Sequence, residues 1–312
     1  MKTSLRYPQH ASSRQRGFTL VEAVVVMVVT GILAGIMVLF IRRPVQNYTD
    51  AAARADLSDA ADLALRRMAR ELRGALPNSV RLTVNNGVWW LEFIPTISGG
   101  RYLAIENETV RGTALNFTNP VAIPFNVVGP MPRSLLTFAP AGPNNYMVVY
   151  NLGVGFLGAD AYARSNLARI TGINPGVDGP TVSFERYWDG DVLGNGRNPF
   201  AAQPNPNSSP DQRFQIVTEP VTFRCQGAAN GRGTLTRSVA ANFLAAQPTP
   251  TAEAGALMAN NVVACNFSIG TTASQQSALI GLSIALGSPD INGGNAVETV
   301  TLTHQIHVDN TP

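Results

Sequence analysis

The stretch FTLVEAVVVMVVTGILAGIMVLFI, from Phe18 to Ile41, decides how the rest of the chain is organised. Its 24 residues carry one charged side chain, that of Glu22. A helix of this length rises about 36 Å, which is enough to cross the hydrocarbon core of a bilayer. It is too long for the apolar core of a secretory signal, and Arg42-Arg43-Pro44 stands where a small-residue cleavage site would lie. The stretch therefore predicts a transmembrane helix.

A short basic leader precedes this helix. Residues 1–17 contain no acidic residue and four cations, which are Lys2, Arg6, Arg14 and Arg16. The positive-inside rule places such a leader in the cytoplasm and the remaining chain across the inner membrane. Without the leader, 19 basic residues stand against 20 acidic ones, so the sequence pI of 9.1 belongs largely to the leader. This removes the electrostatic basis for a nucleic-acid partner.

Glu22 is the anomalous residue of the apolar stretch. A carboxylate inside a hydrocarbon span costs about 2.5–3.5 kcal/mol on insertion scales. It is either tolerated near the interface, where protonation neutralises it, or paired with a cation from another subunit. If the chain were cut after Gly17, Phe18 would gain a free amine one helical turn from this carboxylate. Such an amine and carboxylate can pair between staggered neighbouring helices, which would neutralise both charges.

The residues around this position resemble a known processing signal. The sequence Arg-Gln-Arg-Gly-Phe-Thr-Leu-Val-Glu, from Arg14 to Glu22, is similar to the class III signal of type IV pilins and type II secretion pseudopilins. The resemblance implies cleavage between Gly17 and Phe18 by a prepilin peptidase, N-methylation of Phe18, and a role for Glu22 in docking subunits into a filament. It also implies an α+β, type IV pilin-like fold, in which a long N-terminal helix packs on a β-rich globular head.

The segment 44–77 predicts an amphipathic stem helix. Its apolar stripe recurs at intervals of three and four residues and consists of Leu57, Ala61, Leu65, Met68, Leu72 and Leu76. Gly74 and Pro77 give a stop signal, and Pro44 is expected to kink or interrupt the join with the apolar helix. We therefore predict a cytoplasmic leader over 1–17, a transmembrane and filament-core helix over 18–43, a stem over 44–77 and a periplasmic head over 78–312.

The head reads as a β-rich region punctuated by loops. Residues 80–84 and 88–94 flank Asn85-Asn86-Gly87 and predict a hairpin, in which Trp89 and Trp90 face opposite sides. Further strands are expected at 135–139, 146–152, 181–187, 214–225, 261–269, 278–286 and 298–308. In 278–286 the apolar residues alternate, which indicates a sheet with one buried face formed by Ile280, Leu282, Ile284 and Leu286.

Two cysteines, Cys225 and Cys265, lie in predicted strands. Alternation places Cys225 with Phe223, and Cys265 with Val263 and Phe267, so both thiols point to apolar faces. Beyond the inner membrane the compartment is oxidising. We therefore predict a disulfide between neighbouring core strands, worth about 2–4 kcal/mol, with two separate buried thiols as the alternative.

Two motifs that could indicate ligand chemistry are weak. The run Gly153-Val-Gly-Phe-Leu-Gly158 matches a dinucleotide fingerprint, but strands follow it instead of a repeated βαβ pattern. Asp189, Asp191 and Asn195 lie in an oxygen-rich stretch that is a weak calcium candidate. This stretch lacks the glutamate of an EF-hand, and a surface turn is the preferred interpretation.

Two histidines, His304 and His307, lie three positions apart on a predicted strand, so they face opposite sides and cannot share a metal ion. His304 falls with the apolar residues of that strand and is expected to be half-buried. The sequence offers no plausible catalytic constellation. We therefore expect neither enzyme activity nor a cofactor nor a bound metal.

The length of the chain favours a minor subunit, since the 295 residues after Gly17 are about twice the length of a usual major pilin. Residues 65–81 and 303–312 resemble the minor pilin-like proteins of MSHA (mannose-sensitive haemagglutinin) pilus biogenesis, whereas no resemblance covers 100–215. A J-type pseudopilin of type II secretion and a pilus-associated adhesin head are the alternatives. The resemblance implies other major and minor pilin subunits, the prepilin peptidase and the inner-membrane assembly platform as partners. It also implies an inner-membrane location, followed by the pilus.

Overall fold

The computed structural model describes residues 17–104, 112–131, 145–176, 179–186, 196–201, 208–250, 255–271, 277–289, 294–296 and 298–312. The chain divides into two compact units, Met1–Ala53 and Arg54–Pro312. The described residues form helix α1 and strands β1 to β13. This arrangement is α+β, with an N-terminal apolar helix and a β-rich head.

Helix α1 runs from Leu20 to Arg73. Thr19 is its N-cap: its hydroxyl oxygen accepts a hydrogen bond from the N–H of Glu22 at 3.3 Å, and its carbonyl accepts one from the N–H of Ala23 at 3.2 Å. The expected interruption at Pro44 is wrong, because α1 is one element through that position. A proline has a helix-compatible φ and removes one donor, so a long helix can contain it at a cost in stability.

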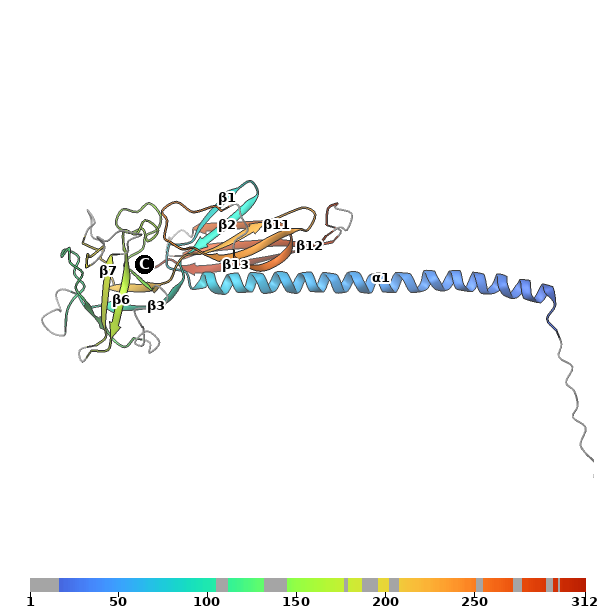
Figure 1. The fold of residues 1–312 in the computed structure, drawn as a ribbon, viewed down its shortest axis with the longest axis horizontal. Helices are drawn as coiled ribbons and strands as arrows, with labels where there is room; N and C mark the ends of the chain where they lie inside the picture. The colour runs from blue at the N-terminus through green and yellow to red at the C-terminus, as the bar shows by residue number, and fades with distance from the viewer. Residues whose placement is uncertain are drawn as a thin grey trace, which may run out of the picture. The chain divides into compact units, whose positions relative to one another are not determined.

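A seven-stranded antiparallel sheet forms the first part of the head, in the order β1-β2-β9-β10-β11-β12-β13. Strands β11, β12 and β13 lie beside the C-terminal part of α1 (Figure 1). The strands of this sheet follow one another in chain order and are β1 (Arg81–Asn85), β2 (Val88–Phe93), β9 (Val221–Gln226), β10 (Gly233–Val239), β11 (Ala256–Thr271), β12 (Ser277–Ser288) and β13 (Glu298–Asp309).

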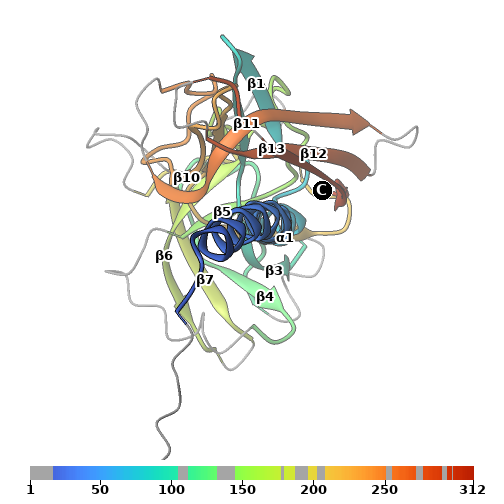
Figure 2. The same cartoon turned by 90° about the vertical axis from the view of Figure 1, so that its right-hand side faces the viewer.

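A closed barrel forms the second part of the head, in the order β3-β4-β7-β6-β5-β8. Strands β4, β7 and β6 lie side by side in Figure 2. The interior is a packed aromatic core, in which the ring of Phe125 lies 5.9 Å from Phe184 and 5.5 Å from Phe214. The strands are β3 (Thr96–Tyr102), β4 (Phe125–Val128), β5 (Tyr146–Val148), β6 (Leu167–Asn174), β7 (Thr181–Arg186) and β8 (Arg213–Val217).

The barrel is an insertion between two neighbouring strands of the sheet. Strands β2 and β9 pair directly, with Phe93 opposite Val221, although the whole barrel lies between them in sequence. The N–H of Thr218 donates to the carbonyl of Pro95 at 3.1 Å, so the chain enters and leaves the barrel at one place. The strand predicted at 214–225 is therefore two strands in different sheets, and Pro220, which has no N–H, lies between them.

The structure confirms some of the other strand predictions and changes the rest. The strands predicted at 181–187, 261–269, 278–286 and 298–308 correspond to β7, β11, β12 and β13. Strand β5 ends at Val148, before the positive φ of Tyr150, and is shorter than predicted. The segment 135–139 lies outside the described residues. Strands β3, β4, β6 and β10 were not predicted, because glycines or polar residues interrupt their alternation.

The hairpin prediction is confirmed. Strands β1 and β2 pair with Val84 opposite Trp89, and the connecting Asn86 and Gly87 have φ values of 50° and 75°. Two positive φ values in a two-residue loop are typical of a type I′ turn, which Asn-Gly favours. Trp89 packs edge-on against a ring of β11, whereas Trp90 is buried on the opposite face of the sheet. The two indoles therefore face opposite sides, as predicted.

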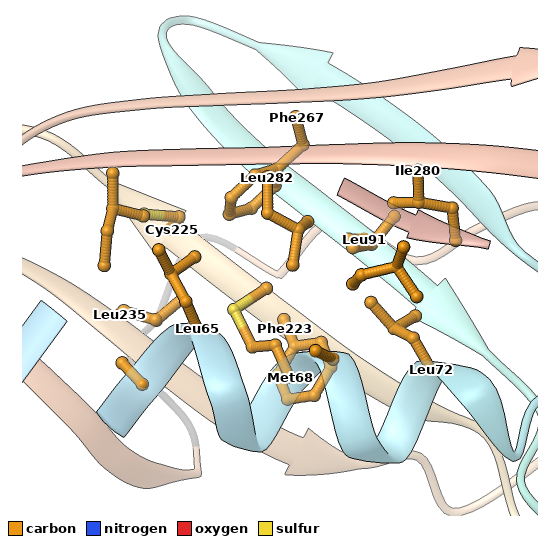
Figure 3. Close-up of a cluster of buried hydrophobic side chains, with 14 of the residues drawn as sticks. Leu65, Met68, Leu72, Leu91, Phe223, Cys225, Leu235, Phe267, Ile280 and Leu282 are labelled. Atoms are coloured by element: carbon orange, nitrogen blue, oxygen red, sulfur yellow. The ribbon is translucent and has the colours of Figure 1, made fainter. Parts of the chain in front are cut away.

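The main core lies between the stem part of α1 and the sheet. Every member of the predicted stripe from Leu57 to Leu76 is buried. Leu65, Met68 and Leu72 point toward the apolar side chains of the sheet in Figure 3. Strand β12 contributes its four alternating residues, all fully buried on the same side, namely Ile280, Leu282, Ile284 and Leu286. Helix and sheet thus bury one apolar face each, which stabilises both elements.

The predicted disulfide is present between Cys225 and Cys265, whose Cα atoms are 6.3 Å apart. The two strands, β9 and β11, are not neighbours in the sheet, because β10 lies between them. The bridge therefore joins next-but-one strands, and not adjacent ones as expected. A register shift in β11 between Val262 and Ala264 also buries Val262 in place of the predicted Val263.

Candidate assembly site

The N-terminal part of α1 exposes a long apolar surface. The segment Leu20–Val38 has a mean hydropathy of 2.5, and none of it is buried by the rest of the chain. Phe18, just before the helix, is 80% exposed. Exposed apolar area of this extent indicates a surface that contacts lipid or other helices.

Glu22 lies in the first turn of α1, one helical turn after Phe18. Both side chains are exposed, and Gly17 lies immediately before Phe18, outside the helix. The structure thus keeps the three predicted residues together at the start of the helix. Their roles in cleavage and docking remain predictions.

Thr19 is a residue that the sequence reasoning missed. It caps the helix, and Glu22 occupies the third helical position after it. The Thr-x-x-Glu spacing is that of a capping box, and it was visible in the sequence. A carboxylate at this position also interacts favourably with the positive end of the helix dipole. The structure shows the Thr19 half of this motif, in which the Glu22 N–H is the donor. An effect of the Glu22 side chain on the helix start must therefore be separated by experiment from a role in docking.

Polar contacts attach the stem to the edge strand β13 and to the central strand β10 of the sheet. Asp62 lies 3.7 Å from Nε2 of His304 on β13, and its other oxygen is 2.6 Å from Nε of Arg66. Glu71 Oε2 lies 2.8 Å from Nε of Arg237 on β10. Hydrogen bonding to Asp62, followed by the charge of that carboxylate, raises the pKa of Arg66. These contacts fix how the stem lies on the sheet.

His304 is half-buried on the face of β13 that meets the stem, while His307 is exposed on the opposite face. This confirms the prediction that the two imidazoles do not converge. Among the residues that the structure describes, no group of three His, Cys, Asp or Glu side chains could hold a metal ion. The calcium candidates Asp189, Asp191 and Asn195 lie outside the described residues.

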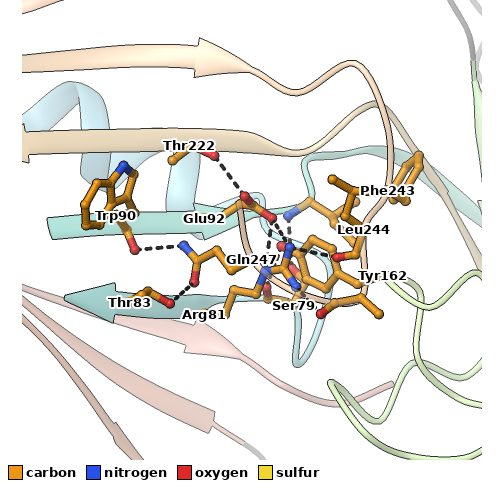
Figure 4. Close-up of polar contacts among 12 residues, drawn as sticks. Ser79, Arg81, Thr83, Trp90, Glu92, Tyr162, Thr222, Phe243, Leu244 and Gln247 are labelled. Carbon is orange, nitrogen blue, oxygen red and sulfur yellow. Dashed lines mark hydrogen bonds and ion pairs between the residues drawn. The ribbon is translucent and has the colours of Figure 1, made fainter. Parts of the chain in front are cut away.

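A buried ion pair lies where the barrel meets the sheet (Figure 4). Glu92 on β2 is 1% exposed and accepts hydrogen bonds from Nε and Nη2 of Arg81 at 3.0 and 2.5 Å. Its second oxygen accepts one from the hydroxyl of Thr222 at 3.0 Å. Arg81 also donates to the carbonyls of Leu244 and Ala245 at 3.0 and 2.9 Å. Most hydrogen-bonding atoms of the carboxylate and the guanidinium thus have a partner, as a buried ion pair requires.

Tyr162, in the barrel loop between β5 and β6, completes this network. Its ring centroid lies 3.5 Å from the guanidinium carbon of Arg81, and its hydroxyl donates to the carbonyl of Ser79 at 2.9 Å. Burial, assisted by the negative charge of Glu92, raises the pKa of Tyr162 well above its ordinary value. The network holds the barrel against the sheet through contacts from both parts.

The glycine run from Gly153 to Gly158 forms a closed turn. All three glycines of the motif have positive φ values, and no helix follows the run in the described part of the chain. Asp160 closes the turn, since its two oxygens accept hydrogen bonds from the N–H groups of Gly155 and Tyr162, each at 2.9 Å. This geometry differs from the strand–turn–helix of a dinucleotide site.

Comparison with known proteins gives one match. The model of the prokaryotic N-terminal methylation motif matches residues 12–38. No curated protein and no solved structure matches the chain. The match confirms the class III signal expected from Arg14 to Glu22. It indicates a type IV pilin-like or pseudopilin subunit, a class that interacts with other pilins and with the prepilin peptidase, and the apolar helix suggests membrane anchoring.

Proposed function

We propose that the chain is a minor pilin-like subunit that helps to prime a type IV pilus of the MSHA type, similar to the biogenesis protein MshO. The observation that carries this proposal is the methylation motif over residues 12–38, which leads directly into the exposed apolar helix Leu20–Val38. The size of the head, enlarged by an inserted barrel, favours a minor subunit over a major one.

The proposed mechanism is assembly, and no catalytic step is assigned to the chain. The prepilin peptidase cleaves between Gly17 and Phe18, and Phe18 is then N-methylated. The apolar helix waits in the inner membrane with the head in the periplasm. The assembly platform extracts the subunit, and the Glu22 carboxylate meets the methylated amine of a neighbour. Pairing neutralises two charges that would each be costly in an apolar environment.

Two other functions are kept as alternatives. A J-type pseudopilin of type II secretion would share the same N-terminus and stem, and it would affect protein export instead of piliation. An adhesin head would need exposed side chains for a ligand. Trp89 is partly buried against the core and gives no support, whereas the turn after Gly153 exposes Val154, Phe156 and Leu157. Substituting Phe156 with serine would reduce surface binding without affecting piliation if the head were an adhesin.

Charge and capping at Glu22 can be separated by substitution. Glu22→Ala removes the charge and the polar side chain, whereas Glu22→Gln removes the charge and keeps a residue that suits the third helical position. Thr19→Ala weakens the helix start by about 1 kcal/mol and keeps the carboxylate. We expect all three variants to be cleaved at Gly17. Both Glu22 variants should enter pili roughly tenfold less or worse, because the neighbour's amine is left unpaired in an apolar environment.

The measurement is the amount of mature chain in sheared pili relative to membranes, with the N-terminus verified by mass. Thr19→Ala should enter pili nearly as well as the unaltered chain. Normal incorporation of both Glu22 variants would contradict the docking role. An equal loss in all three variants would assign the effect to helix initiation.

A further inference from the structure

Strand β13 is one edge of the seven-stranded sheet, and its outer edge is open. It pairs with β12 without interruption from Glu298 to Asp309, and no other described strand lies beside it. Alternate residues of an antiparallel strand direct their N–H and C=O groups to opposite edges, so about half of these groups in β13 point away from β12. No described residue outside β12 forms a backbone hydrogen bond with them. The strand is therefore a template for one more strand.

This edge lacks the features that usually protect an edge strand. Such strands are commonly short, bulged, covered, or interrupted by proline or lysine. From Thr299 to Val308, β13 has no proline, glycine, lysine or arginine, and its register with β12 has no shift. It has twelve residues, whereas the strand at the other edge of the sheet, β1, has five. The unprotected edge of the sheet is thus the edge at β13.

The face of the sheet that points away from the stem is free of charge beside this edge. Strands β11 and β12 contain no Asp, Glu, Lys or Arg, and β13 has only Glu298 and Asp309, at its two ends. Depletion of charged residues is typical of the centre of a protein interface. Neutral residues lie there in three rows across β11, β12 and β13, which are Ala264, Ala285 and Thr301; Asn266, Ser283 and Thr303; and Ser268, Gly281 and Gln305.

The face of β13 that meets the stem shows which side chains an added strand would bury. Ile306 and Val308 are 1% exposed, whereas Val300 and Leu302 are only partly buried, although they pack against the same core. Apolar residues of an added strand would cover Val300 and Leu302 on this face. Its alternate residues would lie on the other face beside the exposed Thr301, where polar side chains suit.

We infer that the outer edge of β13 binds an extended segment of another protein, which joins the sheet as an antiparallel strand. The open backbone groups select a strand, and the two faces select alternating apolar and polar residues. Glu298 is paired with Arg54, whereas Asp309 is exposed. The segment that fits best therefore carries a cation near Asp309. This contact does not depend on which filament system takes up the chain, because it concerns the sheet alone.

A second copy of this chain fits the edge less well. Antiparallel pairing of two β13 strands over their whole length brings Glu298 of one copy close to Asp309 of the other. Like charges at neighbouring cross-strand positions destabilise such a pair. The expected partner is therefore a different chain.

Amide hydrogen exchange of the purified, full chain in detergent tests the edge. The probe is the peptide Lys-Thr-Val-Thr-Val-Thr-Val-Thr-Lys, which alternates and has a cation at each end. At saturating peptide, alternate amides of β13 should exchange about tenfold more slowly or better, because they gain hydrogen-bond partners. The matched control is the same peptide with every backbone nitrogen between the lysines methylated, which cannot donate to a strand and should have no effect.

Three results would overturn the inference. The first is no protection by the probe, and the second is equal protection by the methylated peptide. The third is protection that appears without peptide as the chain is concentrated over about a hundredfold range, because that result would make a second copy the occupant. A peptide with glutamates in place of both lysines should bind more weakly than the probe, and equal binding would contradict the role of Asp309.

Cysteine labelling tests whether a partner covers this edge in cells. The chain has no free cysteine, so Thr301→Cys on β13 and the control Arg232→Cys, at an exposed position before β10, each add one thiol. In membranes from cells that make the chain, Thr301→Cys should react several-fold more slowly with a maleimide than in the purified chain. Arg232→Cys should react equally in both. Equal rates at Thr301→Cys, or the same slowing at both sites, would mean that no partner covers the edge specifically.

Discussion

Tyr102 lies inside the barrel with 3% of its surface exposed, and its hydroxyl donates to the carbonyl of Ser209 at 3.3 Å. Burial raises its pKa from 10.0 to about 12, against the smaller opposing effect of this hydrogen bond. Between these pH values the unfolded chain loses the phenolic proton while the folded chain keeps it. The protonated phenol of Tyr102 therefore contributes to the free energy of unfolding fully below pH 10, and this contribution is lost as pH rises toward 12.

We therefore expect Tyr102→Phe to flatten the decline in unfolding temperature between pH 10 and pH 12, measured by thermal unfolding in detergent. Lysine contributes little there, because Lys2 is the one lysine and arginine stays protonated. The other tyrosines, Tyr162 among them, add the same pH dependence to the unaltered chain and to the variant, so the flattening is partial. Tyr48→Phe, at an exposed position, is the matched control. An unchanged slope in Tyr102→Phe would mean that the phenol is already accessible to water in the folded chain.

At the scale of elements, the stem provides a matched pair of leucines. Leu65 is fully buried against the sheet, whereas Leu63 is 69% exposed two positions earlier. Leu65→Ala should lower the free energy of unfolding by about 2–5 kcal/mol through lost burial and a cavity. Leu63→Ala should change it by less than about 0.5 kcal/mol, because the side chain is exposed in both states. Chemical denaturation of the purified chain measures both, and equal effects would contradict the packing of the stem on the sheet.

Elements that depend on local pattern could be predicted from the sequence, and those that depend on distant pairing could not. The apolar face of the stem from Leu57 to Leu76, the Asn-Gly hairpin and the alternation of β12 each need only a few neighbouring residues. The disulfide partners followed from two thiols on apolar faces. The placement of β10 between their strands depends on the pairing of β10 with both β9 and β11, which no local pattern indicates.

In the candidate site too, residues of a linear motif could be predicted from the sequence, and residues that the fold brings together could not. Gly17, Phe18 and Glu22 were identified by spacing alone, because the processing signal is a linear motif. The Arg81–Glu92–Tyr162 network joins residues up to 81 positions apart, and no spacing rule relates them.

At the scale of the whole molecule, the barrel explains why no resemblance covers residues 100–215. The two ends of the chain form the stem and the sheet, and the barrel from Thr96 to Val217 interrupts the sheet between β2 and β9. A closed barrel requires pairing between β3 and β8, whose residues are more than 100 positions apart. Local sequence pattern does not indicate such pairing. The chain between two paired strands can also be long, since loop-closure entropy grows slowly with length.

This topology predicts that the barrel can be removed. Joining Pro95 to Thr218 through Asn-Gly should leave β2 and β9 paired, because the chain enters and leaves the barrel at one hydrogen-bonded place. The shortened chain should still form the Cys225–Cys265 disulfide and protect the amides of β11 and β12 from hydrogen exchange. Its unfolding temperature should fall, because removing Tyr162 and the barrel exposes Ile94 and other apolar residues of the junction.

The full chain is the reference, and the measurements are mass spectrometry under non-reducing conditions and amide exchange. A control deletion that removes β13 instead should lose protection in β12, because β13 is its hydrogen-bonded neighbour. If the barrel deletion also left β11 and β12 unprotected, the barrel would be required for the sheet to fold. If those amides stay protected, the sheet and stem form a unit that folds by itself and presents the barrel as an added part, which is how one assembly stem could carry heads of different size.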